Sequence, residues 1–163
     1  MIELLCIDVD GTMSDGKLYY SKNGEEIKTF NVKDGLALAY WHKIGRKSAI
    51  ITGRDSEILK IRANELKIDY LFMGIKNKGE CVRNLKKDLN LDSISIASIG
   101  DDMNDISMFR ECGISFGVKN CANGIKNIAN IILSSNGGEG AVREAIEMIL
   151  KQEDLYEEFI KYW

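Results

Sequence analysis

Two acidic clusters in this chain each follow an apolar run. Asp8 and Asp10 end the run in LLCIDVDGT (residues 4–12), and the sequence GDDMND (residues 100–105) follows a second run. Side chains at positions i and i+2 of a strand share a face, and Gly11 lets the chain turn sharply after Asp10. Carboxylates at the carboxyl ends of buried strands lie where open α/β sheets bind ligands, and they suit a hard divalent cation such as Mg²⁺. An aspartate-rich turn and a helix-capping box are the structural alternatives.

Two further segments could hold an anion. Thr52-Gly53-Arg54 follows the apolar Ala49-Ile50-Ile51 and presents a hydroxyl and backbone N–H groups where a helix is expected to begin. A threonine that merely caps the helix would give the same pattern. Lys78 lies in the loop that follows the third expected strand. Lysines in loops are usually solvated, so Lys78 taken alone does not indicate function.

The elements that must position these residues alternate between apolar β-like runs and amphipathic segments. Such alternation predicts an α/β fold, a three-layer Rossmann-like parallel sheet with helices on both faces. The chain has no proline and no Ser- or Gly-rich linker, which favours one domain over residues 1–163. Strands are expected at 2–9, 48–51, 69–73, 94–99, 113–117 and 131–133, and helices at 34–44, from 55 or 56 onward, and at 79–89, 106–110, 122–127 and 140–150.

Residues 17–30 contain a hairpin signal. Asn23-Gly24 separates two alternating segments, 17–21 and 26–30, that carry large apolar side chains. Little chain is available nearby to cover them, so the hairpin is expected to be a flap over the site or a subunit contact. In the following helix, Asp34 is the expected cap, and the expected core positions are Leu36, Leu38, Ala39 and Trp41.

The amino-acid composition limits the kinds of partner that the protein is expected to bind. The 163 residues carry a net charge of −3 without a basic block, which argues against nucleic acid and favours a small ligand. No segment resembles a membrane span or a secretory signal, so a cytoplasmic location is expected. The four cysteines lack metal-type spacing and are expected to be reduced. His42, the only histidine, is expected to have no catalytic role, which leaves proton transfer to carboxylates.

The four motifs together, DxDGT, Thr52, Lys78 and GDDxND, occur in an order that resembles the haloacid dehalogenase phosphatase superfamily. The resemblance implies that Asp8 is the nucleophile that forms an aspartyl-phosphate, and that Asp10 is the general acid and then the general base. It further implies that Thr52 and Lys78 hold the phosphoryl oxygens. Mg²⁺ would be bound by Asp8, Asp101 and the backbone carbonyl of Asp10. Asp102 and Asp105 are expected in the outer shell or as alternate ligands.

The intervals between the motifs are too short for the cap domain that many members insert, so the chain resembles a capless member. The hairpin, FNVKDG (residues 30–35) and GGEGAVRE (residues 137–144) are most similar to capless phosphatases that release an eight-carbon sugar acid from its 8-phosphate for lipopolysaccharide synthesis. A nine-carbon sialic-acid-type 9-phosphate is the alternative substrate. Arg54 and Arg143 are candidate partners of the substrate carboxylate, with surface arginines as the alternative. Gly138 is a candidate substrate-binding position.

The resemblance also implies a homotetramer in which a neighbouring subunit closes the open site. The aromatic tail at residues 152–163 is expected either to dock on that neighbour or to pack on its own chain. Two other functional classes stay open at this stage. A receiver domain also accepts phosphate on an aspartate with help from Thr and Lys, and a non-catalytic scaffold could retain the fold.

Overall fold

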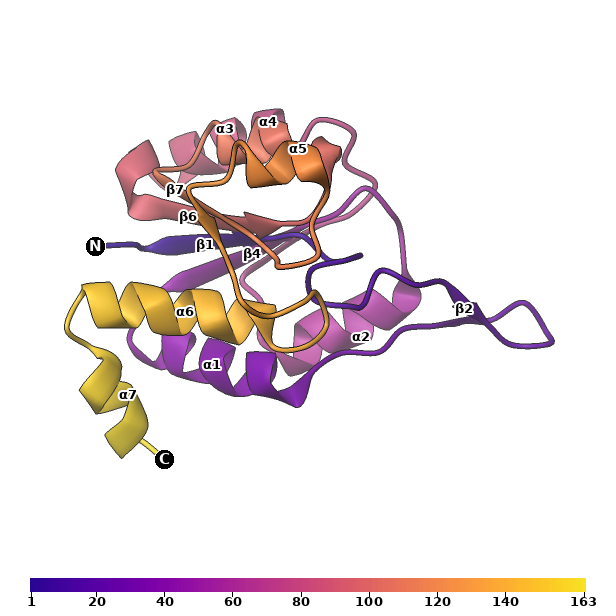
Figure 1. The fold of residues 1–163 in the computed structure, drawn as a ribbon, viewed down its shortest axis with the longest axis horizontal. Coiled ribbons are helices and arrows are strands. Elements are labelled where there is room, and N and C mark those ends of the chain that lie inside the picture. Colours follow the sequence, from indigo (N-terminus) through magenta and orange to yellow (C-terminus); the bar gives the residue numbers. More distant parts are fainter.

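The computed structural model describes residues 1–163, and a six-stranded parallel sheet forms its centre (Figure 1). The strand order is β5-β4-β1-β6-β7-β8. This arrangement confirms the predicted Rossmann-like α/β fold without a cap domain. The strands are β1 (Leu4–Ile7), β4 (Lys47–Ile51), β5 (Tyr70–Phe72), β6 (Ile96–Gly100), β7 (Ile114–Gly117) and β8 (Ile131–Ile132).

Helices cover both faces of the sheet (Figure 1). One layer holds α1 (Val32–Lys43), α2 (Glu57–Glu65) and α6 (Ala141–Gln152). The opposite layer holds α3 (Lys78–Asp88), α4 (Ile106–Phe109) and α5 (Asn123–Lys126). Two 3-10 turns, η1 (Ser93–Ser95) and η2 (Met103–Asp105), flank β6, and α7 (Tyr156–Lys161) ends the chain. No helix has the length and apolar character needed to cross a membrane.

The first strand is the centre of the core. Every side chain of β1 is fully buried, because helices cover both faces of the sheet and β4 and β6 pair with its two edges. Strands covered on both faces are apolar throughout rather than alternating, as LLCI is. The central position of β1 means that the residue that follows it, Asp8, emerges at the middle of the sheet edge.

Helix α1 differs from the expectation in its start. Asn31 is the N-cap, and its side chain accepts a hydrogen bond from the backbone N–H of Lys33 at 2.9 Å. Asp34 is not the cap: it lies in the first turn and is buried. Of the expected core positions, Leu38 and Trp41 are fully buried, whereas Ala39 is exposed. Because α1 packs on α6 as well as on the sheet, its buried face includes Asp34 and not Ala39.

Two other local expectations have different outcomes. Ser56, one of the two positions at which this helix was expected to begin, caps α2 through a hydrogen bond from the backbone N–H of Leu59. The hairpin is present, but its paired strands are short, β2 (Tyr19–Tyr20) and β3 (Glu26–Ile27), and it projects from the body of the molecule (Figure 1). Several of its large apolar side chains are exposed, namely Leu18, Tyr19, Tyr20 and Ile27.

The C-terminal tail packs on its own chain. Phe159 of α7 is buried, and its ring meets the ring of Tyr40 edge-on at a centroid distance of 5.1 Å. The guanidinium of Arg143 also lies over the Phe159 ring, 5.4 Å from the ring centroid. Trp163 at the end of the chain is exposed. Phe159 thus packs within the chain, and contact of the exposed end of the tail with a neighbouring subunit stays a prediction.

Candidate active site

Parallel pairing brings the sequence motifs to one edge of the sheet. Ile7 pairs with Ile50 of β4 on one side and with Ile99 of β6 on the other. The residues that follow these three strands therefore leave the sheet at the same level, since parallel strands keep their carboxyl ends together. Asp8, Thr52 and Asp101 are the residues that directly follow β1, β4 and β6. The sheet register thus gathers three motifs that are far apart in the sequence.

Lys78 joins this edge from the first turn of α3. Its side chain is 1% exposed, and its Nζ donates to a carboxylate oxygen of Asp8 at 2.5 Å and to one of Asp105 at 2.6 Å. Asn77 caps the helix by accepting from the N–H of Glu80, which fixes where α3 begins. From the sequence alone, Lys78 was indistinguishable from other loop lysines. In the structure it is a buried cation between two buried carboxylates.

The electrostatics of this cluster are dominated by negative charge. Burial, and then the neighbouring carboxylate of Asp105, raise the pKa of Asp8 to about 6 even though Lys78 opposes the rise. Burial and the carboxylates of Asp8 and Asp105 raise the pKa of Asp101 to about 8. Burial disfavours the charged form of Lys78, but Asp8 and Asp105 outweigh it and raise the pKa of the ammonium. Lys78 therefore stays cationic, and one cation faces three acids.

This donor set fits a divalent cation. Asp8, Asp101 and Asp105 each place a carboxylate oxygen within 4.8 Å of the others. With all three ionised, the single ammonium of Lys78 leaves two negative charges unbalanced, and carboxylate oxygens are the ligands that Mg²⁺ prefers. Gly11 makes the close approach possible: its φ of +97° suits glycine, and a Cβ there would collide with the carboxylate of Asp101.

Asp102 and Asp105, which the sequence did not separate, lie in different surroundings. Asp105 is fully buried, contacts Lys78 and accepts a hydrogen bond from the N–H of Asp101 at 2.9 Å. Asp102 is exposed, and its carboxylate accepts from the N–H of Met103, while the Asp105 carboxylate accepts from the N–H of Asp102. The capping box considered from the sequence is therefore present, and the same GDDMND segment also supplies the acidic cluster.

Thr52 and Asp10 complete the expected catalytic set. Thr52 is buried at the end of β4, and its hydroxyl accepts a hydrogen bond from the N–H of Arg54 at 3.4 Å. The carboxylate of Asp10 is paired with the ammonium of Lys28, which comes from the hairpin. Sequence reasoning missed Lys28. The available signal was the two-residue spacing from Glu26, which places both side chains on one face of the hairpin strand.

Glu26 connects the hairpin to the rim of the site. Its carboxylate accepts a hydrogen bond from Arg54 at 2.8 Å and from the hydroxyl of Ser56 at 3.0 Å, and it lies 3.3 Å from the ammonium of Lys28. Arg54, a predicted partner of a substrate carboxylate, thus sits at the rim with 39% of its side chain exposed and an internal carboxylate as its partner.

The glycine-rich loop before α6 packs against the catalytic loop. The N–H of Gly138 donates to the carbonyl of Thr12 at 3.0 Å, and its own carbonyl accepts from the side-chain amide of Asn31 at 3.2 Å. A Cβ on Gly137 would collide with the Gly11 carbonyl. The loop glycines therefore permit the backbone of this loop to contact the backbone of the loop that carries Asp10. Both hydrogen bonds of Gly138 are made to residues of the same chain, Thr12 and Asn31.

Arg143 is tied to this region by its backbone. Its N–H donates to the buried carboxylate of Asp34 at 2.9 Å, so Asp34 of α1 helps cap α6 from across the helix pair. Its side chain pairs with Glu147 at 2.6 Å and stacks on Phe159. Burial raises the pKa of Asp34 to about 6 against the effect of the Arg143 N–H. The structure does not bring the Arg143 guanidinium to Asp8.

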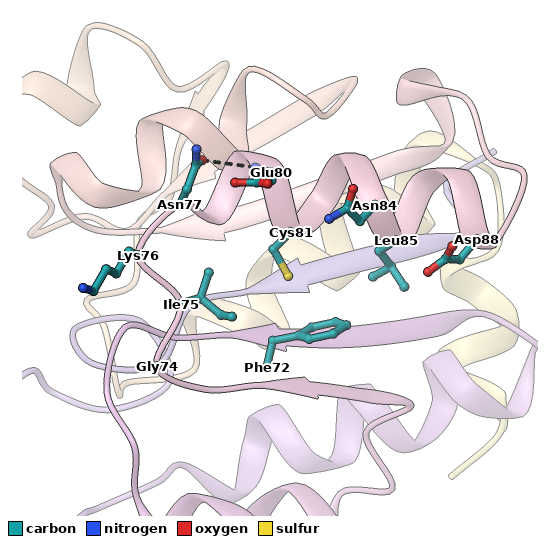
Figure 2. A pocket seen from close by; sticks show the side chains of 10 residues that line it. All are labelled: Phe72, Gly74, Ile75, Lys76, Asn77, Glu80, Cys81, Asn84, Leu85 and Asp88. Carbon is teal, nitrogen blue, oxygen red and sulfur yellow. Dashed lines mark hydrogen bonds between the residues drawn. The ribbon is translucent and has the colours of Figure 1, made fainter.

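A separate hollow of about 450 Å³ lies beside α3 (Figure 2). Phe72, Ile75, Cys81 and Leu85 supply its apolar part, and polar side chains including Lys76, Asn84 and Asp88 surround them. None of the predicted catalytic residues lines it. It shares only the segment before Lys78 with the acidic cluster, so the hollow and the candidate active site are distinct features.

Comparison with known proteins gives consistent matches. Residues 74–146 match the family described as haloacid dehalogenase-like hydrolase. A 3-deoxy-D-manno-octulosonate 8-phosphate phosphatase from Haemophilus influenzae is 39% identical over 150 residues, which span 92% of this chain and 83% of that protein. The corresponding enzyme from Yersinia pestis is 38% identical over 156 residues, 96% of this chain and 83% of the relative.

A solved structure agrees with these matches. The 3-deoxy-D-manno-octulosonate 8-phosphate phosphatase of Moraxella catarrhalis, determined in complex with a magnesium ion, a phosphate ion and a KDO molecule, is 38% identical to this chain. The two superpose with a TM-score of 0.95 over 99% of this chain and 92% of that one. The similarity thus extends over the whole fold, including the edge of the sheet that carries the acidic cluster.

Proposed function

Because the chain belongs to the haloacid dehalogenase-like hydrolases, in the family of the 3-deoxy-D-manno-octulosonate 8-phosphate phosphatases, we propose that it hydrolyses 3-deoxy-D-manno-octulosonate 8-phosphate. The products are inorganic phosphate and the free sugar acid, which is a lipopolysaccharide precursor. One observation carries the proposal: Asp8 leaves the central strand in contact with the buried Lys78 and within the acidic cluster. That geometry suits nucleophilic attack on a phosphate.

In the first step, a carboxylate oxygen of Asp8 attacks phosphorus and the bond from phosphorus to the sugar oxygen breaks. The leaving alkoxide takes a proton from the carboxyl group of Asp10, so that the sugar acid departs with a hydroxyl. The enzyme is left with an aspartyl-phosphate on Asp8 and a carboxylate on Asp10. Both side chains lie on the same loop at the end of β1, which is where such a division of roles requires them.

In the second step, Asp10 acts as a base. Its carboxylate takes a proton from a water molecule as the water oxygen attacks phosphorus. The bond between phosphorus and the Asp8 oxygen breaks, which releases inorganic phosphate and restores the Asp8 carboxylate. Asp10 ends the cycle protonated, ready for the next leaving group. The unfavourable single displacement by water is thereby divided into two easier steps.

Lys78 and Thr52 bind and stabilise in this scheme. The ammonium of Lys78 offsets the charge of Asp8 and would contact the phosphoryl oxygens, while the buried hydroxyl of Thr52 would donate to them. Asp8, Asp101 and the backbone carbonyl of Asp10 would hold Mg²⁺, while the Asp105 carboxylate stays bound to Lys78 and to the N–H groups of Asp101 and Asp102. When bound, Mg²⁺ reduces the repulsion between an anionic nucleophile and an anionic phosphate.

The sugar-acid end of the substrate is assigned to the rim. Arg54 supports this assignment because its side chain is partly exposed two residues after Thr52, and a guanidinium can bind a carboxylate with two parallel hydrogen bonds. A substrate carboxylate would have to compete with Glu26 for it. Gly138 and Arg143 complete the proposed set, with Arg143 needing to leave Glu147 before its side chain could reach a substrate.

We further propose a homotetramer in the cytoplasm, in which a neighbouring subunit closes the open site. The projecting hairpin supports this proposal, since its large apolar side chains Leu18, Tyr20 and Ile27 are exposed, and subunit contacts bury side chains of this kind. The tail packs on its own α1 through Phe159, whereas Ile160, Tyr162 and Trp163 stay exposed in the single chain.

A phosphate-release assay tests the function. The purified protein is offered 3-deoxy-D-manno-octulosonate 8-phosphate and a nine-carbon sialic-acid-type 9-phosphate, each with Mg²⁺ and with EDTA. We expect turnover that EDTA abolishes and a higher kcat/KM for the eight-carbon substrate. A higher kcat/KM for the nine-carbon compound would instead identify that compound as the substrate. A stable phospho-aspartate without turnover would instead indicate a receiver domain, and no release from any sugar phosphate would indicate a scaffold.

A further inference from the structure

Lys28 occupies a position that the reaction scheme above does not use. Its side chain is 3% exposed although it belongs to a projecting hairpin, and its ammonium is paired with the carboxylate of Asp10. Its second acidic neighbour is Glu26, at 3.3 Å. An ammonium with both partners inside the chain and almost no exposure to water has a defined position, so it can define the position of the groups around it.

The hairpin strand β3, which Lys28 directly follows, is fixed to the body of the protein. Glu26 accepts a hydrogen bond from the hydroxyl of Ser56, and Ser56 is the N-cap of α2. Glu26 also accepts from Arg54, which directly follows the Thr52-Gly53 turn. These bonds join β3 to the ends of two core elements. The base of the hairpin is therefore held close to Asp10 even though its tip extends into solvent (Figure 1).

Asp10 itself has few restraints. Its side chain is 23% exposed, and Lys28 is the side-chain partner recorded for it. The carboxyl group has to face the leaving oxygen in the first step and the attacking water in the second, and small errors in such a position cost large factors in rate. The Lys28 ammonium also favours the carboxylate that appears on Asp10 as its proton moves to the leaving alkoxide.

We propose that Lys28 is a positioning residue for the general acid: the hairpin delivers its ammonium to Asp10 and holds that carboxyl group against the leaving oxygen of the substrate. This inference rests on the proposed phosphatase function. It gives the hairpin a role in the chemistry within one subunit, in addition to any role as a flap or a subunit contact.

Leaving-group dependence tests the proposal. A sugar alkoxide needs a proton to leave, whereas p-nitrophenolate leaves without one. For Lys28→Met we expect kcat/KM to fall about 10- to 100-fold on the sugar 8-phosphate and by less than about threefold on p-nitrophenyl phosphate. Lys28→Arg should recover most of the loss. Lys22→Met, at an exposed lysine of the same hairpin, is the matched control and should change neither substrate.

A double-mutant cycle provides a second readout on the sugar substrate alone. If Lys28 acts through Asp10, Lys28→Met should cost little more in an Asp10→Asn background, and the two losses should be far from additive. Additive losses, equal losses on both substrates, or a rise in KM with an unchanged kcat would each overturn the proposal. An inactive wild type would instead contradict the proposed function, because the wild-type rate with Mg²⁺ is measured first.

Discussion

The catalytic edge (Asp8, Lys78, Asp101, Asp105) and the hairpin side (Glu26, Lys28, Arg54) are neighbouring regions built in different ways. The catalytic edge comes from the ends of regular strands and the start of α3, and its Lys78 and Asp105 are almost completely buried. The hairpin side comes from a short two-stranded ribbon and a loop, and Arg54 is 39% exposed. In the proposed reaction, the region that handles phosphorus is fixed by the core, and the region that binds the sugar is fixed by side-chain ion pairs.

Their charges differ in the same way. At the catalytic edge three carboxylates cluster around one ammonium, which pairs with Asp8 and Asp105, and the excess of negative charge suits a divalent cation. On the hairpin side Lys28 and Arg54 are matched by Asp10 and Glu26, so the charges are already balanced without a ligand. The comparison indicates that the first region is prepared for a cation, whereas the second must exchange an internal partner for a substrate group.

Removing the nucleophile should have the largest effect. Asp8→Asn keeps the shape of the side chain but cannot attack phosphorus, so phosphate release should fall by about 1,000-fold or more. Circular dichroism should show that the fold persists, because the substitution also removes a buried charge. Wild-type turnover in this variant would contradict the assignment of the chemistry to the catalytic edge.

Removing the buried cation should damage both stability and rate. Lys78→Met leaves Asp8 and Asp105 facing each other without compensation, so the free energy of unfolding at pH 7.5 should fall by about 3 kcal/mol. Phosphate release should fall by about 100-fold or more, since the phosphoryl oxygens lose a cation. Urea unfolding and steady-state kinetics measure the two effects.

Lys76→Met is the matched control for that prediction. Lys76 is exposed in the same loop, two residues earlier, and it lines the separate hollow rather than the catalytic edge. Its substitution should alter stability by less than about 0.5 kcal/mol and leave kcat unchanged. Similar losses in both variants would mean that the loop, and not the Lys78 ammonium, is what matters.

On the hairpin side, Glu26→Gln should have a moderate effect. The amide can still accept a hydrogen bond from Ser56, but it no longer balances Lys28 and Arg54. We expect kcat/KM for the sugar 8-phosphate to change by about three- to tenfold with little change in the free energy of unfolding, because the pair is near the surface. Glu25→Gln, at the exposed neighbouring position, should be silent. A stability loss as large as that of Lys78→Met would remove the distinction between the two regions.

Asp34 allows a finer test, because it is a buried carboxylate outside the catalytic edge that lacks an ammonium partner. Its pKa is raised from 3.8 to about 6 by burial, so the folded state binds its proton more tightly than the unfolded state. This group therefore favours folding at low pH, and that contribution is lost as the pH rises from about 4 to 6. Asp34→Asn does not titrate.

The stability of Asp34→Asn relative to wild type should therefore increase by about 2 kcal/mol between pH 4 and pH 7, and then stay constant. Urea unfolding of both proteins across this range measures the difference, in which the titration of all other groups cancels. A difference that is independent of pH would mean that the pKa of Asp34 is the same in the folded and unfolded states, with the Arg143 N–H offsetting the effect of burial.

The sequence specified the catalytic edge well for a physical reason. Asp8, Thr52 and Asp101 each follow an apolar strand segment, and parallel pairing necessarily brings the carboxyl ends of such strands together. Lys78 needed the family resemblance, since nothing local marks a loop lysine as buried. The expectation for α1 was wrong in its cap because Asp34 finds its partner on α6, which is 109 residues away.

What the sequence by itself determined is which strand each motif follows and which residue types the motifs offer for the proposed reaction. Only the tertiary structure decided which acids share Lys78, how Asp105 differs from Asp102, and that the hairpin brings Lys28 to Asp10. Strand periodicity is local and can be read directly from the chain. The path of a hairpin and the partner of a long flexible side chain depend on the packing of distant segments, and no local pattern contains that information.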